Sequence, residues 1–310
     1  IRISDALRCF AAIVIKFAVR QKSASSFLAL LRSLYYIAHE SLSVYNKTQV
    51  RQTTESTGEN LSYLKYETYN LPTAIVSNTL DYGKFDILDT TQYMKNTLGV
   101  WKALDFQFDA ISTGFIVSKE QTQMITEFCI ENAAKGVTVF TDPIMGDDGK
   151  LYNGMSEETV ELMRKLISVA DYIVPNYTEA CYLTGTAYEA DGITKEDYHK
   201  MIDALRALGT KSVVITSAIV KDSVNKAVMG YDHIENKYFQ IDFDEIPVRF
   251  PGTGDIFSAI FMAKILNGET LQTATHKAMN AVRTMIMKNA ENADKFKGIP
   301  LETCLEVLDE

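Results

Sequence analysis

The stretch from Phe250 to Lys264, "FPGTGDIFSAIFMAK", places a glycine-rich turn and one acid before a long apolar run. Backbone N–H groups at the start of a helix attract anions, and glycine lets the oxygens of a phosphate group approach them closely. Asp255 would then lie in the first helical turn, where it could take a proton from an alcohol that attacks the phosphate. An ordinary capped helix start would look the same, so this stretch alone leaves both interpretations open.

A second acidic stretch is "VFTDPIMGDDGKLY". Asp142 ends a predicted strand, because Pro143 cannot continue the strand pairing. Asp147 follows in a turn between glycines. Carboxylates at the end of a strand can hold Mg²⁺ through oxygen atoms and water. We interpret Asp148 as a solvated surface acid and expect function at Asp142.

Two further strand ends carry polar side chains. In "DYIVPNYTEACYLTG", Asn176 and Glu179 lie on one face of the first turn of a predicted helix. The same spacing is also that of a capping box, in which the two residues satisfy backbone groups at the helix start. In "KSVVITS", Thr216 and Ser217 place two hydroxyl groups at a strand end, where they could bind a phosphate or simply cap a turn.

Alternating β-rich and helical patterns surround these motifs from Leu71 onward, which is typical of a parallel sheet covered by helices. Ligands of such sheets bind where strands end and helices begin. Residues 226–250 alternate apolar and polar side chains and predict antiparallel hairpins. The expected strands are "LPTAIVS", "FDAIST", "VTVFTD", "DYIVPN" and "KSVVITS", and the expected helices span 89–104, 118–135, 155–169 and 195–208.

Residues 1–70 differ from the rest of the chain, because they contain one glycine and no proline. "SASSFLALLRSLYYIAHESL" predicts a helix, and the polar stretch after it predicts a loop or linker. We therefore expect an atypical N-terminal segment over 1–70, which could supply an early strand, and a second domain over 71–310.

Bulk composition excludes several classes of function. The net charge of -9 argues against a nucleic acid or an anionic membrane as the main partner. The four cysteines form no C-x-x-C pair, which fits a reducing cytoplasm and gives no sign of a zinc site or a disulfide framework. An early apolar stretch is broken by Arg8 and Lys16 and lacks a clear cleavage site, so we expect neither a membrane span nor a signal peptide.

Taken together, the motifs indicate phosphoryl transfer. That reaction needs a base for the acceptor alcohol, donors for the charge that develops on oxygen, and Mg²⁺ near the phosphates. The sequence contains no Walker-type G-x-x-x-x-G-K-[ST] motif, no protein-kinase H-R-D set and no early G-x-G-x-x-G turn.

The motifs "PGTGD", "DPIMGDDGKLY", "VPNYTEACYLTG" and "VVITS" resemble those of the ribokinase-like sugar and vitamin kinases. The chain is most similar to the bacterial pyridoxal/pyridoxamine kinase branch, and "LPTAIVSNT" and "FDAISTGFIVSKEQ" look like two further segments of it. The resemblance covers residues 71–290 in the family's order. It implies a three-layer α-β-α fold with a mostly parallel sheet, and ATP-dependent phosphorylation of the 5′-hydroxymethyl group of pyridoxal, pyridoxamine or pyridoxine with Mg²⁺.

The resemblance also implies roles for individual residues. Asp255 resembles the catalytic base, and the turn before it resembles the anion hole. Asp142 and Glu179 look like metal-organising acids. The anion hole comprises Gly252, Thr253 and Gly254; the nucleotide contacts are Asn176, Thr216, Ser217 and Asp147; and the contacts to the vitamin ring are Thr79 and Phe115, of which the aromatic ring suits stacking.

The start of the chain departs from the family pattern, because "ISDALRC" lacks the family's glycine-containing turn and "SNTLDYG" replaces its usual His-Thr-Gly order. Two alternatives therefore stay open: a hydroxymethylpyrimidine kinase of thiamine synthesis, and a nucleotide-binding relative with impaired catalysis. The "MGDDGKLY" run favours the vitamin B6 kinase. By resemblance we also expect a homodimer in the cytoplasm.

Overall fold

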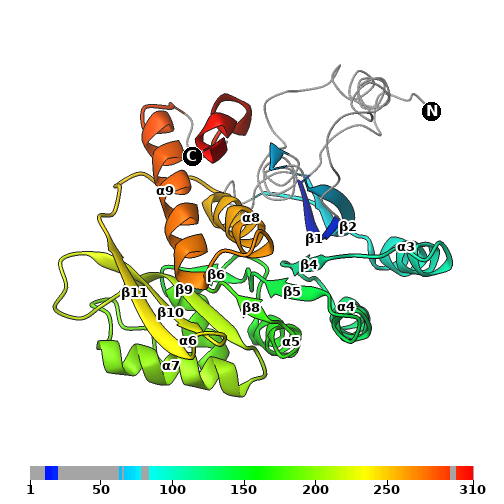
Figure 1. Cartoon of the computed structure of the whole chain (residues 1–310), viewed down its shortest axis with the longest axis horizontal. Helices are drawn as coiled ribbons and strands as arrows, with labels where there is room; N and C mark the ends of the chain where they lie inside the picture. The colour runs from blue at the N-terminus through cyan, green and yellow to red at the C-terminus, as the bar shows by residue number, and fades with distance from the viewer. Residues whose placement is uncertain (1–10, 20–62, 65, 78–83, 294–297, 310) are drawn as a thin grey trace.

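The computed structural model describes residues 11–19, 63–64, 66–77, 84–293 and 298–309. Their main feature is a nine-stranded sheet with the strand order β11-β10-β9-β8-β5-β4-β1-β2-β3 (Figure 1). Its strands are β1 Ala11–Val19, β2 Glu67–Val76, β3 Ile87–Asp89, β4 Ala110–Thr113, β5 Thr138–Thr141, β8 Tyr172–Ile173, β9 Ser212–Ile219, β10 Lys226–Asp232 and β11 Lys237–Phe243. A separate hairpin pairs β6 Gly146–Asp147 with β7 Lys150–Leu151.

The centre of the sheet is parallel, since β4 pairs with β5, β5 with β8 and β8 with β9 in the same direction. Antiparallel strands complete both sides, with β10 and β11 on one side and β1, β2 and β3 on the other. The predicted strands are therefore present. Of the hairpins predicted over residues 226–250, one forms, from β10 and β11, and residues 244–250 form no strand. The predicted three-layer fold with a mostly parallel central sheet is confirmed.

Helices cover both faces of the sheet (Figure 1). One layer comprises α3 Thr91–Ala103, α4 Lys119–Ala133, α5 Glu157–Ile167, α6 Tyr177–Thr184 and α7 Lys195–Ala207, and the other comprises α8 Thr253–Leu266, α9 Leu271–Asn289 and the short 3₁₀ helices η4 Leu301–Thr303 and η5 Leu305–Asp309. Successive residues of a strand point to opposite faces of the sheet and therefore pack against different helical layers. In β9, Val213 and Ile215 lie in the cluster with α3–α7, whereas Val214 lies in the cluster with α8 and α9.

Strand β1 joins the two sides of the sheet near the predicted vitamin-binding segment. It pairs antiparallel with β2 over its whole length and with residues 110–112 of β4. An early strand thus lies beside "LPTAIVS". The predicted helix over 23–42 and the following linker fall outside the described residues, and the domain boundary at residue 70 stays a prediction.

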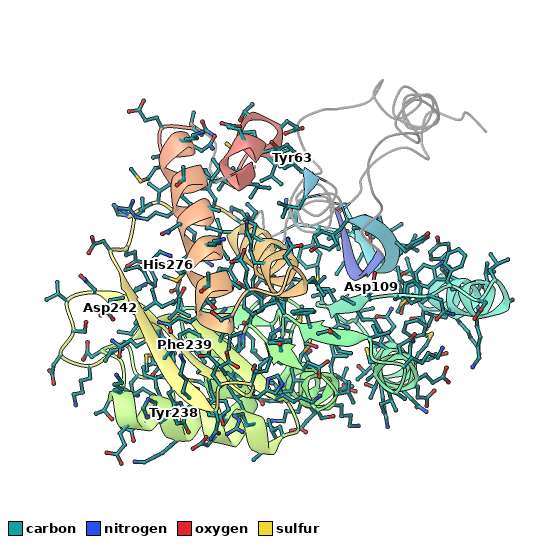
Figure 2. The ribbon with its side chains drawn as sticks, viewed as in Figure 1. Tyr63, Asp109, Tyr238, Phe239, Asp242 and His276 are labelled. Carbon is teal, nitrogen blue, oxygen red and sulfur yellow. The ribbon has the colours of Figure 1, made fainter. Side chains whose placement is uncertain are left out.

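The position of α8 in the fold explains why its sequence is apolar on every side. It packs against the sheet and against α9, and residues from Ile256 to Ala263 are almost all buried, apart from Ser258. Side chains fill the space between the sheet and both helical layers, including Phe239 of β11 (Figure 2). The Phe239 ring lies over Gly230 of β10, where a Cβ atom would stand 2.3 Å from it. Among the described residues, no helix is both long and apolar enough to cross a bilayer.

Candidate active site at the start of α8

The glycine-rich turn forms the start of α8 as the sequence predicts. Gly252 is the residue before the helix and has a φ of 82°, a left-handed conformation that glycine adopts without strain. Phe250 is buried in the core, and its carbonyl oxygen accepts a hydrogen bond of 3.2 Å from the Thr253 hydroxyl, which fixes the turn. A Cβ atom built on Gly254 would meet no heavy atom within 4 Å. The space beside Gly254 is therefore open, which an anion site at this turn requires.

Asp255 lies in the first turn of α8 and is partly buried. Ser258 follows it by three residues, so the two side chains lie on the same face of the helix. The Ser258 hydroxyl donates a hydrogen bond of 2.7 Å to Oδ2 of Asp142. Residues 116 positions apart in the sequence are thus joined, and the acid at the end of β5 lies next to the turn of α8 that carries Asp255.

Asp142 lies directly after β5, and its backbone N–H donates to the carbonyl oxygen of Thr113 at the end of β4 (2.9 Å). Burial raises the pKa of Asp142 to about 6, and the hydrogen bond from Ser258 acts in the opposite direction. The carboxyl group is therefore held where its negative charge is poorly solvated. A cation or a proton placed beside it would be bound favourably.

Asn176 and Glu179 start α6 as a capping box. The Asn176 side chain accepts from the Glu179 N–H (2.9 Å), and Oε2 of Glu179 accepts from the Asn176 N–H (2.8 Å). Glu179 also reaches back to the acidic stretch, because its Oε1 accepts a 3.1 Å hydrogen bond from the Met145 N–H. Burial, and then the charge of Asp142, raise the pKa of Glu179 well above its usual range. The capping interpretation is correct, and the same residues also place a second buried carboxylate near Asp142.

The hairpin of β6 and β7 carries Asp147 and Asp148. Its two turn residues, Asp148 and Gly149, both have positive φ values (50° and 76°), as a tight two-residue hairpin requires. The Gly149 N–H donates 2.9 Å to the Thr178 hydroxyl on α6. The guanidinium group of Arg249 contacts both acids, at 2.9 Å from Asp147 and 2.8 Å from Asp148. Asp148 is an exposed acid as expected, but it is paired with Arg249 rather than only solvated.

Thr216 and Ser217 lie in β9 and not at its end, because the strand continues to Ile219. Its pairing with β10 shifts register at these two residues, and Ser217 has a φ of 55°. Such a bulge redirects side chains and is common beside functional sites. Thr216 forms a parallel bridge with Asn176, so it lies next to the α6 capping box.

The predicted vitamin-ring contacts are only partly described. Thr79 falls outside the described residues. Phe115 follows β4 and is only 4% exposed, packed in a small apolar cluster with Ala74 and Val76. The Thr73 hydroxyl donates to the Phe115 carbonyl oxygen (2.9 Å) and holds this segment against β2. The role of Phe115 as a stacking partner stays a prediction.

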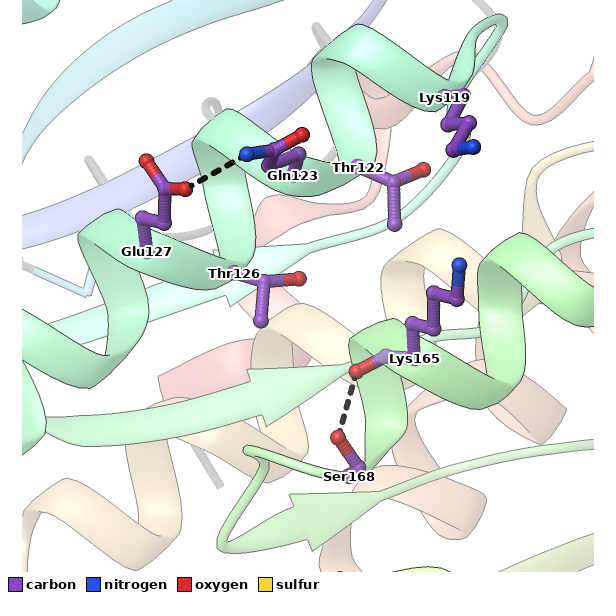
Figure 3. A pocket seen from close by; sticks show the side chains of 7 residues that line it. All are labelled: Lys119, Thr122, Gln123, Thr126, Glu127, Lys165 and Ser168. Atoms are coloured by element: carbon purple, nitrogen blue, oxygen red, sulfur yellow. Dashed lines mark hydrogen bonds between the residues drawn. The ribbon is translucent and has the colours of Figure 1, made fainter.

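A groove of about 350 Å³ lies elsewhere, between α4 and α5 (Figure 3). Its lining residues are Lys119, Thr122, Gln123, Thr126, Glu127, Lys165 and Ser168. None of the predicted site residues lines this groove. Among the described residues, the groove is therefore separate from the acids that contact α8 and α6.

Comparison with known proteins agrees with this geometry. Residues 64–299 match the model of a protein family described as phosphomethylpyrimidine kinase. The chain belongs to the phosphomethylpyrimidine kinase family. The matched region contains α8 and every strand of the sheet except β1.

Several family relatives with known names or structures are similar to this chain. A structure of a putative phosphomethylpyrimidine kinase from Bacteroides thetaiotaomicron, in a form with pyridoxal, has a TM-score of 0.80 and 33% sequence identity, covering 85% of this chain and 92% of that one. Pyridoxal kinase from Lactobacillus plantarum has a TM-score of 0.72 and 26% identity, covering 83% and 91%. Pyridoxal kinase PdxY of Haemophilus influenzae is 26% identical, over 80% of this chain and 88% of its own length.

Coverage varies among the relatives. A putative pyridoxal kinase of Caenorhabditis elegans is 31% identical over 51% of this chain, and the match spans 49% of that protein's length. The resemblance of the motifs to the ribokinase-like vitamin kinases is confirmed by these comparisons.

Three residues of this site were not predicted from the sequence. Ser258 is the partner of Asp142, and Arg249 is the partner of Asp147. Tyr152 is partly buried nearby, where burial and the charges of Glu179 and Asp147 raise its pKa. Ser258 could have been noticed as the one polar residue within the apolar part of α8. Arg249 has no comparable signal, because its contact joins positions 101 residues apart.

Proposed function

We propose that the protein transfers the γ-phosphoryl group of ATP to the 5′-hydroxymethyl group of pyridoxal, pyridoxamine or pyridoxine. The observation that carries this proposal is the hydrogen bond between Ser258 and Asp142, because it brings the helix turn of Asp255 beside the acids at the strand ends. The names of the similar pyridoxal kinases support the choice of substrate.

Asp255 is the catalytic base in this proposal. It accepts the proton of the substrate hydroxyl while that oxygen forms a bond to the γ-phosphorus atom, and the bond from phosphorus to the bridging oxygen of ATP breaks to release ADP. In this proposal, the backbone N–H groups of Gly252, Thr253 and Gly254 stabilise the charge that develops on the transferred group. The open space beside Gly254 leaves room for its oxygens.

Mg²⁺ fits the acids of this site. Two carboxylates, Asp142 and Glu179, lie close enough that the charge of one raises the pKa of the other. Within the described ranges, no group of three or more His, Cys, Asp or Glu residues is placed to hold a metal ion. Mg²⁺ commonly takes only one or two protein carboxylates and completes its shell with water and phosphate oxygens. Asp142 and Glu179 would hold it in this way, and when bound it would neutralise phosphate charge.

The remaining predicted residues have supporting roles. Asn176 and Thr216 are joined by a parallel bridge and can donate to nucleotide phosphates, with Ser217 next to Thr216 in β9. Asp147 lies on the hairpin whose Gly146 carbonyl oxygen accepts a hydrogen bond from Asn176. We assign Thr79 and Phe115 to the vitamin ring on the resemblance alone.

An assay with purified protein, ATP, Mg²⁺ and each of the three B6 vitamers tests this function directly. We expect a phosphorylated product from at least one vitamer. Omitting Mg²⁺ and adding a chelator should abolish its formation. If no vitamer is phosphorylated under conditions in which ATP binds, the proposed function is wrong.

A second candidate is a hydroxymethylpyrimidine kinase, which the description of the matching family model favours. The same assay with hydroxymethylpyrimidine separates the two, because the substrate with the higher kcat/KM is the one that the site fits. The "MGDDGKLY" run leads us to expect higher values with a vitamer.

Two further properties, the oligomeric state and the location in the cell, complete the proposal. We infer from the resemblance that the protein acts as a homodimer in the cytoplasm. Light scattering of the purified protein tests the first property, and cell fractionation tests the second.

A further inference from the structure

Arg249 connects two parts of the site that are far apart in the sequence. Its Nη2 atom lies 2.9 Å from Asp147 and its Nη1 atom lies 2.8 Å from Asp148, on the hairpin of β6 and β7. Its backbone precedes the buried Phe250, which leads directly into the glycine turn. One side chain therefore spans from the anion turn of α8 to the acidic hairpin.

Both ends of this connection are firmly held. The hairpin rests on α6 through the hydrogen bonds from Gly149 to Thr178 and from Asn176 to the Gly146 carbonyl oxygen (2.9 and 2.8 Å). A Cβ atom at Gly149 would stand 2.7 Å from the Tyr188 ring, so the turn packs tightly there. An arginine anchored between two fixed elements can set the distance between them.

The charge of Arg249 also bears on nucleotide binding. ATP would bring its phosphates among the carboxylates of Asp142, Asp147 and Glu179, and like charges repel. Burial raises the pKa of Asp147, and the positive charge of Arg249, 2.9 Å away, opposes this rise. A guanidinium group has five N–H donors in a planar fork, so it can keep its aspartate contacts and also donate to phosphate oxygens.

We propose that Arg249 is a positioning residue for the nucleotide, which holds the Asp147 hairpin against the anion turn and offsets the charge of the phosphates. This inference rests on the proposed use of ATP at this site, but not on the identity of the acceptor. Its side chain is 60% exposed, so the contact is accessible to an incoming nucleotide and contributes little to folding.

Calorimetric titration of a non-hydrolysable ATP analogue with Mg²⁺ tests the proposal without any vitamer. We expect Arg249→Ala to weaken binding about tenfold or more, and Arg249→Lys to recover part of the loss because it keeps the charge but not the fork. Arg206→Ala is the matched control, because Arg206 also pairs with an aspartate (3.5 Å from Asp203) but lies on α7. ATP-analogue binding by this variant should change by less than about twofold, because none of the predicted nucleotide contacts lies on α7.

A double-mutant cycle of Arg249→Ala with Asp147→Asn gives a second readout, and we expect Arg249→Ala to cost less ATP affinity in the Asp147→Asn background than in wild type. In a kinase assay with a vitamer that the protein phosphorylates, Arg249→Ala should raise KM for ATP by a larger factor than it lowers kcat. Wild-type affinity in Arg249→Ala, or an equal loss in Arg206→Ala, would overturn the proposal. If no vitamer is phosphorylated but Arg249→Ala still loses ATP affinity, the acceptor assignment fails and the role of Arg249 stands.

Discussion

Two pairs of carboxylates lie near the start of α8, and the protein holds them in different ways. The inner pair, Asp142 and Glu179, is held by neutral donors, namely the Ser258 hydroxyl and the backbone N–H groups of α6 and Met145. The outer pair, Asp147 and Asp148, is held by the charge of Arg249 and is 35% and 76% exposed.

This difference separates two functions. Neutral donors fix the inner carboxylates without cancelling their charge, so those groups stay ready for a cation or a proton. The exposed Arg249 offsets part of the negative charge of the outer pair, and its remaining N–H groups are accessible to phosphate oxygens. The predictions below test the contrast, beginning with the largest effect.

The first prediction concerns Asp255, which lies three residues before Ser258, the partner of the inner carboxylate Asp142. Asp255→Asn should lower kcat by about 10²–10⁴-fold, because the amide cannot accept the proton of the substrate hydroxyl. Calorimetry should show ATP affinity within about threefold of wild type, since the anion turn is unchanged. Activity close to that of the wild type would remove Asp255 from the role of base.

The second prediction concerns the pH dependence of the inner pair. The pKa of Asp142 is raised to about 6 by burial, so the folded protein binds this proton more tightly than the unfolded chain does. Its contribution to stability is therefore complete below about pH 4 and is lost as the pH rises through about 6. Relative to Asp142→Asn, metal-free wild type should lose about 2–3 kcal/mol of unfolding free energy between pH 4 and pH 8.

Urea unfolding with a chelator present measures this difference at each pH. Asp148→Asn serves as the control, because an exposed outer carboxylate should give no comparable dependence. Parallel pH profiles for wild type and Asp142→Asn would show that the inner carboxylate is well solvated.

The third prediction concerns the backbone donors of the inner pair. Glu179→Ala should lower the free energy of unfolding by about 2 kcal/mol, because the N–H groups of Met145 and Asn176 lose their buried acceptor. Glu179→Gln keeps one carbonyl acceptor and should lose less. Chemical denaturation of wild type, Glu179→Gln and Glu179→Ala measures the order of their unfolding free energies. Equal stabilities of Glu179→Ala and wild type would contradict the prediction.

The smallest effect is expected in the outer pair. Asp148→Asn should change the free energy of unfolding by less than about 0.5 kcal/mol, because its partner and its own carboxylate are both exposed. A thermal shift of several degrees in this variant would show that the outer pair stabilises the fold, which would erase the contrast with Glu179.

Much of the fold follows from local sequence patterns. The strands "FDAIST", "VTVFTD" and "KSVVITS" and the helices between them are present, because alternation and helical periodicity reflect which side of each element faces a core. The end of β9 differs, since its register shift at Thr216 and Ser217 depends on pairing with β10. Local propensity carries no information about such a partner.

For the site, the sequence by itself determined the residue types and their local geometry: the glycine turn before Asp255, the acid after β5 and the capping box of Asn176 and Glu179. These depend on neighbours within a few positions in the chain. The contacts of Ser258 with Asp142 and of Arg249 with Asp148 follow only from the tertiary structure, because hydrogen bonds and ion pairs between positions 116 and 101 residues apart form only when the sheet and α8 pack together.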